Sequence, residues 1–490
     1  MVISLSKMKD VKLAPQYQQE GGNDYIVEVG AGISLLEFYS ILGLHWKDLL
    51  GVDAPLGFNG GSCPSVGLSG LVQGGGLGVM SNRYGWSADR IVGAEVVVYN
   101  RTTDMFETVI ANYMQHQDLL KALKGGMGGN YGAVTRWWVK VFPAPRVVHL
   151  NLHSNDQVNK TKSISYMQSY MDFSHAATLD GSIPLPNNSF WTQVNFDSFN
   201  GLCMCDGDNC TDCYQMINYI QGSILDSPNN CTGTDYLNQC EVTESSLAEM
   251  TWNFGGCQDL FPGEGATWND TQAAIKSCFD ATTGSSFEDH SSLFLDTTVS
   301  QNEQFFDIAW NLTKEDRTYQ GGLEFDIIVG AFTKQPTDCG EAECTTLQHR
   351  TPGWHIQFNS YFSNASETEY YKAWIQEARE AMFPIGGSLQ TAYQNYLSDL
   401  IPRNNWKTEY FPGTTNGKPT YEFLQDVKCE YNARNTFGRV ATEGYEIEVP
   451  EDCLLLTNAS VDNADSNSAS NQLTVLSALL LTATVLALIN

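Results

Sequence analysis

A glycine-rich stretch from Gly57 to Tyr84 holds nine glycines and one cysteine, Cys63. Glycine at this density permits positive φ angles and close approach of the backbone to a ligand, at an entropic cost that an ordinary strand or helix avoids. A phosphate-binding P-loop would continue with Gly-Lys-Ser/Thr, which is absent here, and a dinucleotide-binding turn needs a preceding parallel strand. The stretch therefore predicts a ligand-binding loop of another kind.

Three motifs, in order along the chain, resemble those of one enzyme family, the berberine-bridge-enzyme-like FAD-linked oxidases. The glycine-rich run with Tyr84, Gly85 and Asp89 resembles their flavin-binding core. Residues 118–135, followed by a Phe-Pro-Ala-Pro exit, resemble their "DLxxALRGGGGGNFGIVT" segment. Residues 393–399 and 428–437 resemble "YxNYxD" and "KxxYDPxNxF". The resemblance spans most of the chain and implies FAD as cofactor, with a small-molecule substrate and O2 as partners.

The fold that this resemblance implies is α+β with two lobes, an FAD-binding PCMH-type lobe and a substrate lobe built on an antiparallel sheet. Its expected parts are an FAD-binding domain at 1–145, a substrate-binding domain at 146–400 with a cysteine-rich insert at 203–278, a segment at 401–445 that returns to the flavin lobe, a polar spacer at 446–472 and a hydrophobic tail at 473–490.

The resemblance also implies the residues that hold the flavin. Cys63 matches a position where a cysteine can bond to the flavin ring, and Val66 matches the residue at the oxygen entrance, where valine goes with oxidases and isoleucine with dehydrogenases. An alternative for Cys63 is a small buried thiol. The other expected flavin-binding residues are Gly67, Gly70, Gly74, Gly75, Gly76, Gly78, Gly129, Asn130, Gly132, Val134 and Asn395.

Oxidation over a flavin ring needs a base that takes the O–H or N–H proton of the substrate. His355 stands where family members carry Glu or Lys, and Gln357 and Tyr393 match active-site neighbours, so these three are the expected catalytic residues. A structural histidine is the alternative for His355. Leu77 stands where many members have a tyrosine of the base pair.

The Trp, Tyr and Gln residues of the substrate lobe favour oxidation of a sugar or alcohol hydroxyl, and the resemblance at Val66 implies an oxidase with H2O2 as product. Two other functions stay open. One is amine or alkaloid oxidation, and the other is a catalytically inactive cell-surface glycoprotein that keeps the fold as a ligand-binding module.

The chain has thirteen cysteines, twelve of them between Cys203 and Cys453. In an oxidising compartment twelve cysteines can form six disulfides, so Cys63, the thirteenth, is expected to have another role. The spacing of Cys203, Cys205, Cys210 and Cys213 is also compatible with a zinc site. We favour disulfides and expect no metal, because Asn209-Cys210-Thr211 is itself a glycosylation sequon.

Charge and sequons indicate the compartment. The net charge of −29 argues against a nucleic-acid partner, which would require clustered Lys and Arg. Nine Asn-X-Ser/Thr sequons predict passage through the secretory pathway to the cell surface or beyond. The uncharged tail at 473–490, preceded by a polar spacer, is typical of a glycolipid-anchor signal, with a membrane-spanning tail as the alternative.

The start of the sequence lacks two features that these markers call for. Neither a signal peptide nor the phosphate-cradling R-x-G-G-H-S loop of the family precedes the strand-like pattern after Met1. We expect the complete gene to encode both upstream of Met1.

Local patterns place the main elements. Ser34 and Glu37 form a capping box that predicts a helix from residue 35, and residues 118–124 form a helix stopped by two glycines. Residues 94–99 read as a buried strand, and Pro143 closes a β-rich run, which sets the first domain boundary near residue 145. In the middle of the chain, helices are expected at 156–172 and 367–382, and strands at 147–152, 189–196, 323–329 and 355–362.

Overall fold

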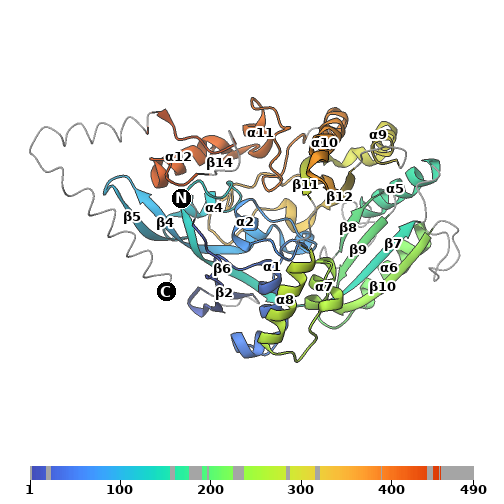
Figure 1. The fold of residues 1–490 in the computed structure, drawn as a ribbon, viewed down its shortest axis with the longest axis horizontal. Coiled ribbons are helices and arrows are strands. Elements are labelled where there is room, and N and C mark those ends of the chain that lie inside the picture. Colours follow the sequence, from blue (N-terminus) through green and yellow to red (C-terminus); the bar gives the residue numbers. More distant parts are fainter. Residues whose placement is uncertain are drawn as a thin grey trace, which may run out of the picture.

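The computed structural model describes residues 3–17, 24–154, 160–175, 190–195, 198–224, 237–282, 287–314, 321–387, 389–438, 445–451 and 453. Two antiparallel sheets dominate it, one on each side of the view in Figure 1. Helices cover both sheets, so the α+β prediction is confirmed.

The first sheet is built from the N-terminal part of the chain. Its strand order is β1 (Val11–Leu13), β2 (Tyr25–Gly30), β6 (Ala133–Pro143), β4 (Ile91–Asn100) and β5 (Met105–Asn112), with β3 (Leu56–Gly57) pairing with β6. The short helices of this lobe are α1 (Leu35–Gly43), α2 (Leu68–Gln73), α3 (Ser81–Tyr84) and α4 (Gln117–Leu123). The predicted capping box at α1 is present, because the Ser34 side chain accepts from the Glu37 N–H and the Glu37 side chain accepts from the Ser34 N–H.

The second sheet has seven strands and begins directly after the first lobe. Its order is β10 (Leu237–Ser246), β7 (Arg146–Ser154), β9 (Ser198–Met204), β8 (Phe190–Val194), β12 (Gly322–Ile328), β13 (Gly353–Phe362) and β11 (Phe287–Asp296). Its apolar face forms one core with α5 (Lys160–His175), α6 (Thr211–Ile224), α9 (Glu303–Thr313) and α10 (Thr368–Met382). The predicted strands and helices of this region are present, with ends shifted by a few residues.

The segment 203–278, expected as an insert, is part of both lobes. It supplies β10, which pairs with β7 along its length. It also supplies α7 (Leu247–Phe254) and α8 (Trp268–Thr282), which both pack against α1 of the first lobe. Most residues of β10 are polar or acidic, so its sequence does not alternate between apolar and polar residues. The sequence pattern alone therefore did not predict this strand.

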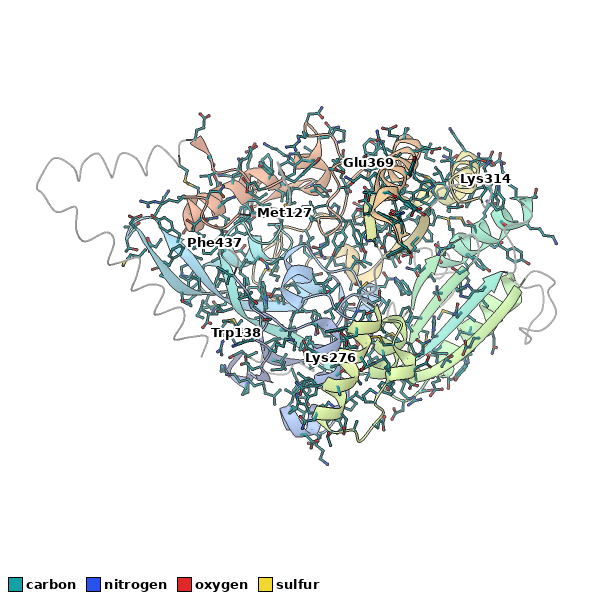
Figure 2. All side chains as sticks on the ribbon, viewed as in Figure 1. Met127, Trp138, Lys276, Lys314, Glu369 and Phe437 are labelled. Carbon is teal, nitrogen blue, oxygen red and sulfur yellow. A yellow bond between two sulfur atoms is a disulfide. The ribbon has the colours of Figure 1, made fainter. Side chains whose placement is uncertain are left out.

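The C-terminal part of the chain packs on the first sheet. Helix α12 (Thr420–Asn432) contacts β4 and α4, and α11 (Trp406–Tyr410) contributes Trp406 and Tyr410 to the same core. Between them lies a two-stranded ribbon, β14 (Thr414–Thr415) and β15 (Lys418–Pro419). In Figure 2 side chains fill the space below α12, where the labelled Met127 is buried. The expected return of the chain to the flavin lobe is confirmed.

Disulfides join the cysteines for which a zinc site was the alternative. The pairs are Cys203–Cys213, Cys205–Cys210, Cys257–Cys278, Cys339–Cys344 and Cys429–Cys453, and Cys240 is also disulfide-bonded. The disulfide prediction is therefore confirmed at the four cysteines with zinc-like spacing.

The predicted hydrophobic tail and most of the polar spacer lie outside the described residues, so the anchor stays a prediction. In the described part of the chain, no helix has both the length and the apolar character needed to cross a membrane.

Candidate active site

The glycine-rich stretch has an open part around Cys63. Cys63 keeps an exposed thiol, which makes its reading as a buried cysteine wrong. Val66 is 36% exposed. Gly67 and Gly70 are exposed too, and a Cβ added to either would have no heavy atom of the described residues within 4 Å. This part of the backbone therefore presents a bare surface on which a flat group has room to lie.

The later glycines of the stretch are buried, and their neighbours explain why they must be glycine. A Cβ on Gly76 would lie 2.3 Å from the Ser87 side chain, and one on Gly78 would lie 2.1 Å from a backbone oxygen. Gly75 and Gly76 also have φ angles of +121° and +84°. At Gly74 the obstacle is Asn395, whose Oδ1 would lie 1.8 Å from an added Cβ. Gly74, Gly75, Gly76 and Gly78 thus serve close packing of the loop in this structure.

Tyr393 fastens this loop to the second lobe. Its hydroxyl oxygen accepts the N–H of Gly76 at 2.7 Å, the N–H of Leu77 at 3.1 Å and Nδ2 of Asn395 at 2.8 Å. Burial raises the pKa of Tyr393 to about 12, although these three hydrogen bonds favour its ionised form. Tyr393 is therefore a neutral hydroxyl at physiological pH, held in place by the loop.

A polar cluster lies on β12 and β13. His355 is fully buried, and its Nδ1 is 3.4 Å from Oδ2 of Asp326. Gln357 donates from Nε2 to the same carboxylate oxygen at 3.0 Å and accepts from the Tyr396 hydroxyl at 2.9 Å. Two buried polar atoms of the cluster, Nε2 of His355 and Oδ1 of Asp326, have no hydrogen-bond partner among the described residues. Such atoms are expected where a ligand completes a site.

Glu324 is a second carboxylate on the same face of β12, two residues before Asp326. It is half-buried and accepts a hydrogen bond of 3.1 Å from Nε2 of Gln193. Burial, together with the charge of Asp326, raises the pKa of Glu324 to about 7. A carboxylate with a pKa near 7 is suited to accept a proton in catalysis at neutral pH.

Tyr396 links the polar cluster to Cys63. Burial raises the pKa of Tyr396 well above its usual value, and the charges of Asp326, Cys63 and Glu324 act in the same direction. Cys63 also contributes to the raised pKa of Tyr39, whose hydroxyl donates to the carbonyl of Gly61 at 2.8 Å. Cys63 of the first lobe thus lies within electrostatic range of the cluster on the second.

The second glycine segment lies against α2, β4 and α12, and the N–H of Met127 donates to the carbonyl of Gln73 at 3.1 Å. Oδ1 of Asn130 accepts from Nζ of Lys428 at 3.3 Å and from the N–H of Ile447 at 3.2 Å. A Cβ on Gly132 would lie 2.6 Å from the carbonyl oxygen of Val97. Asn130 and Gly132, which lie next to Gly129 and Val134 in the chain, are therefore packed against other parts of the protein in this structure. Asn395, in contrast, joins the Cys63 stretch, because its Nδ2 donates to the carbonyl of Leu71 at 3.0 Å.

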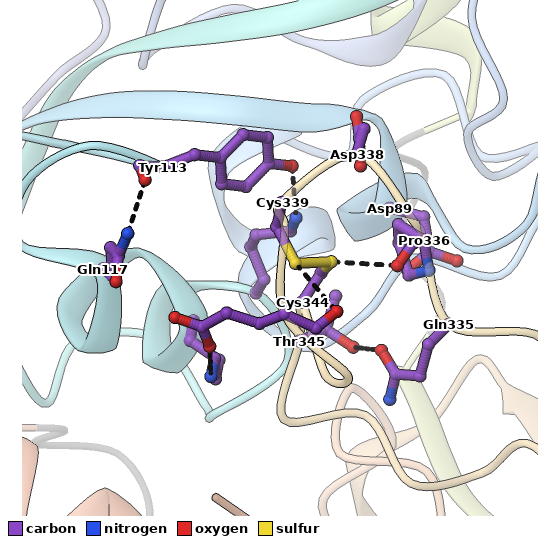
Figure 3. Close-up of a disulfide and its surroundings, with 12 residues drawn as sticks. Asp89, Tyr113, Gln117, Gln335, Pro336, Asp338, Cys339, Cys344 and Thr345 are labelled. Atoms are coloured by element: carbon purple, nitrogen blue, oxygen red, sulfur yellow. Dashed lines mark hydrogen bonds and ion pairs between the residues drawn. A yellow bond between two sulfur atoms is a disulfide. The ribbon is translucent and has the colours of Figure 1, made fainter.

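A loop of the second lobe, residues 334–350, ties the two lobes together (Figure 3). Arg350 donates to both oxygens of Asp89, at 2.8 and 2.7 Å. Lys140 pairs with Asp338, and the Cys339–Cys344 disulfide closes the loop between these pairs. Nearby, burial lowers the pKa of Lys124 to about 7. We call the Arg350–Asp89 and Lys140–Asp338 ion pairs, with the Cys339–Cys344 disulfide between them, the clamp. It holds β13, the strand that carries His355, in its orientation towards the glycine-rich stretch.

The residues present fit the ring end of a flavin. The bare surface at Cys63, Val66, Gly67 and Gly70 offers room for a planar ring. The charge of Cys63 acts on Tyr396, whose ring stacks on His355 of the polar cluster at 5.8 Å between centroids. The sequence prediction named Gln357, Tyr393 and His355 but missed Asp326, Glu324 and Tyr396. The signal for the two acids was available, because Leu-Glu-Phe-Asp-Ile alternates apolar and acidic residues and so places both carboxylates on one face of a strand.

Known proteins with similar sequences match a limited part of the chain. The FAD-linked oxidoreductase easE of Trichophyton verrucosum (strain HKI 0517) is 35% identical over 151 residues, which are 30% of this chain and 23% of that protein. Reticuline oxidase of Eschscholzia californica is 32% identical over 126 residues, 26% of this chain and 22% of that protein. The matched segments thus span less than a quarter of these relatives. No protein-family model matches the chain.

Solved structures match over most of the chain. A chitooligosaccharide oxidase superposes with a TM-score of 0.66 at 20% identity, covering 91% of this chain and 81% of that one. A glucooligosaccharide oxidase of Acremonium strictum, whose structure revealed a novel flavinylation, gives 0.62 at 18% identity, with 91% and 81% covered. These similarities confirm the two-lobed fold that the motifs implied.

Proposed function

We propose that the protein, a berberine-bridge-enzyme-like FAD-linked oxidoreductase, oxidises a hydroxyl group of a sugar or alcohol and passes the electrons to O2, giving H2O2. FAD is the cofactor, in keeping with the relatives and structural neighbours above. One observation carries the proposal. Tyr393 accepts hydrogen bonds from the N–H groups of Gly76 and Leu77, in the stretch that also holds the exposed thiol of Cys63, and its ring lies 5.8 Å between centroids from His355 of the polar cluster.

Cys63, Val66, Gly67 and Gly70 are the residues that would hold the flavin ring, with Cys63 as the site of a covalent bond to it. When bound, FAD supplies the acceptor for the hydride that leaves the substrate carbon, and O2 takes up the electron pair. Tyr393 and Asn395 would fix the loop below the ring, because both bond to its backbone. The flavin contacts expected at Gly129, Asn130, Gly132 and Val134 stay predictions.

Glu324 is the residue we assign as the general base. The hydroxyl proton of the substrate passes to its carboxylate, which is half-buried and has a pKa of about 7. Gln193 and Gln357 orient the neighbouring oxygens through their amide groups. Asp326 stays behind as a fixed negative charge that raises the proton affinity of Glu324.

His355 acts through Asp326 in this scheme. The sequence left open whether it serves as the base or orients one; in the structure its ring is fully buried, and its Nδ1 is 3.4 Å from Oδ2 of Asp326. A histidine in this position holds the carboxylate in one orientation, as the third group of a catalytic triad holds its partner. We therefore propose it as a positioning residue.

The proposal also includes the cellular location of the protein. The disulfides support an oxidising compartment. The sequon asparagines Asn209, Asn269 and Asn364 are exposed, as glycosylation requires. We propose a secreted or cell-surface protein, with attachment through the C-terminal tail still a prediction.

The test starts from the full-length protein produced in a secretory host. We expect it to be yellow, to lose its flavin colour when a sugar or alcohol is added without oxygen, and to release H2O2 when air is admitted. A panel of neutral sugars, alcohols and secondary amines separates hydroxyl oxidation from amine oxidation. A colourless protein that binds a ligand without turnover would support the inactive glycoprotein instead.

A further inference from the structure

A pocket of about 470 Å³ lies between the β4–β5 hairpin and α12, and we call it the hairpin pocket. In Figure 1 α12 lies above these two strands. The pocket lining includes Asn100 and Glu107 from the hairpin, and Asp426 and Glu430 from α12. None of its described lining residues belongs to the candidate active site. Pockets of roughly 300–1,000 Å³ are typical of sites that hold a small molecule, so the hairpin pocket has room for a separate occupant.

Asn100 indicates what that occupant is. It is the first residue of the sequon Asn100-Arg101-Thr102, at the end of β4. Asn100 is half-buried in the pocket lining, whereas the other sequon asparagines that the structure describes are exposed, namely Asn209, Asn269, Asn311 and Asn364. A glycan on Asn100 would therefore begin inside a pocket, and glycans on the other four would begin in solvent.

The side chain of Asn100 projects towards α12. Val98 pairs directly with Glu107, and side chains two residues apart in a strand share a face, so Asn100 lies on the same face as Val98 and Glu107. Val98 is buried in the core that Leu424 and Val427 of α12 also enter. The face of the hairpin that carries Asn100 is thus the one that α12 covers.

The hydrogen bonds of Asn100 leave its amide able to carry a sugar. Oδ1 accepts the backbone N–H groups of Thr102 at 2.8 Å and Thr103 at 3.2 Å. Nδ2 donates to Oε1 of Glu107 at 2.8 Å. Transfer of an oligosaccharide from a lipid-linked sugar diphosphate breaks the bond between sugar C1 and the diphosphate oxygen, forms a C1–Nδ2 bond and releases one amide proton. The second N–H stays on Nδ2, and one N–H is all that the bond to Glu107 needs.

The polar lining of the pocket suits the groups of a neutral sugar. Glu107, Asp426 and Glu430 bring carboxylate oxygens, which accept from sugar O–H groups and from the N–H of an acetamido group. Arg101 brings N–H groups that donate to sugar oxygens. The carboxylates outnumber this guanidinium, which disfavours a phosphate or another anion from solution.

We propose that Asn100 carries an N-linked glycan whose first sugar units occupy the hairpin pocket and hold α12 against the first lobe. The glycan then has a structural role that glycans on the exposed sequons do not share. The proposal concerns the folded glycoprotein and does not depend on the reaction that it catalyses.

The first test compares two glycans of the full-length protein produced in a secretory host. Mass spectrometry of its glycopeptides should find Asn100 occupied. An amidase that hydrolyses the side-chain amide of a glycosylated asparagine should then act on the native protein at least about tenfold more slowly at Asn100 than at the exposed Asn269, because access to Asn100 requires local opening. After denaturation the two rates should be similar.

The second test removes the sequon without touching Asn100. Thr102 is exposed, and only its backbone N–H bonds to Asn100, so Thr102→Ala leaves the turn intact. We expect amide hydrogen exchange in α12 to become at least about threefold faster, the effect of losing one or more hydrogen bonds. Thr102→Ser keeps the sequon and should exchange like the parent. Asn269→Gln, which removes an exposed sequon, should also leave exchange in α12 unchanged.

Three results would overturn the proposal. They are an unmodified Asn100, equal amidase rates at Asn100 and Asn269 in the native protein, and exchange in α12 that is the same in Thr102→Ala and the parent. Slow exchange in Thr102→Ala that becomes fast after exhaustive dialysis would assign the pocket to a dissociable small molecule, and would overturn the proposal as well.

Discussion

Tyr396 donates a 2.9 Å hydrogen bond to Gln357, and Gln357 donates a 3.0 Å hydrogen bond to Asp326. The two bonds form a chain from a half-buried tyrosine to a buried carboxylate. The tyrosine end lies within electrostatic range of Cys63, and the carboxylate end lies beside Glu324 on β12. Tyr396, Gln357 and Asp326 are thus connected by side-chain hydrogen bonds, so the role of each can be tested by replacing that residue.

Replacing Glu324 by glutamine should slow reduction of the flavin by substrate. Loss of a general base typically costs 10²–10⁴-fold, because the hydroxyl proton then has no acceptor. In the parent the rate should rise with pH through about 7, since only the ionised carboxylate accepts a proton. Anaerobic stopped-flow measurement across pH checks both effects. Glu380→Gln, on an exposed turn of α10, should behave like the parent. An unchanged pH profile in Glu324→Gln would exclude Glu324 as the base.

The same carboxylate should make the stability of the protein depend on pH. Its pKa is raised from 4.5 to about 7 in the folded state, so folding is favoured while it stays protonated. That contribution is complete below about pH 4.5 and is lost as pH rises through 7. Glu324→Gln should therefore gain roughly 2–3 kcal/mol relative to the parent on going from pH 5 to pH 8. Denaturant unfolding at both pH values measures this difference, and an equal difference at the two would contradict it.

Cys63→Ser should abolish covalent attachment of the flavin. The thiol is exposed in the open part of the glycine-rich stretch, where the hydroxyl of serine cannot form the same bond to the ring. Acid precipitation followed by flavin fluorescence of the pellet checks the result, and peptide mapping of the parent locates the bond. Ser65→Ala, two residues away and also exposed, should keep the flavin bound. Recovery of the Cys63 peptide as an unmodified thiol from yellow parent protein would overturn the assignment.

Val66→Ile should slow reoxidation of the flavin by O2 and leave its reduction by substrate nearly unchanged. The side chain is 36% exposed at the edge of the bare surface, so an added methylene would extend into the space above that surface. Stopped-flow measurement of the two half-reactions separates the effects. Val79→Ile, a half-buried valine of the same stretch, is the matched control. Reoxidation as fast as in the parent would mean that Val66 does not control the access of oxygen.

Arg350→Met should destabilise the protein by about 3–5 kcal/mol, because it leaves the buried carboxylate of Asp89 without its partner. The two side chains are only 10% and 7% exposed, and they connect the lobes. Urea unfolding measures the loss. Lys276→Met breaks a pair whose side chains are 78% and 66% exposed, and should change stability by less than about 1 kcal/mol. Equal effects of the two substitutions would show that the clamp does not stabilise the fold.

Features set by near neighbours in the chain could be predicted from the sequence. The capping box needs only Ser34 and Glu37, three residues apart, so its geometry follows once a helix forms. Alternation likewise predicted β8, β12 and β13, because a strand with one apolar face shows it residue by residue. The odd cysteine count singled out Cys63 without any knowledge of which pairs form.

The tertiary structure alone decided which residues meet. Cross-strand register brings Asp326 opposite His355 and Gln193, which are separated from it by 29 and 133 residues of chain, and no local pattern encodes that pairing. The glycines show the same limit. All of them read alike in the sequence, yet Gly67 and Gly70 border open space while Gly76 and Gly78 are packed against Ser87 and Gly60. A residue's own chemistry fixes what it is able to do, whereas long-range packing fixes which groups surround it and whether a ligand has room beside it.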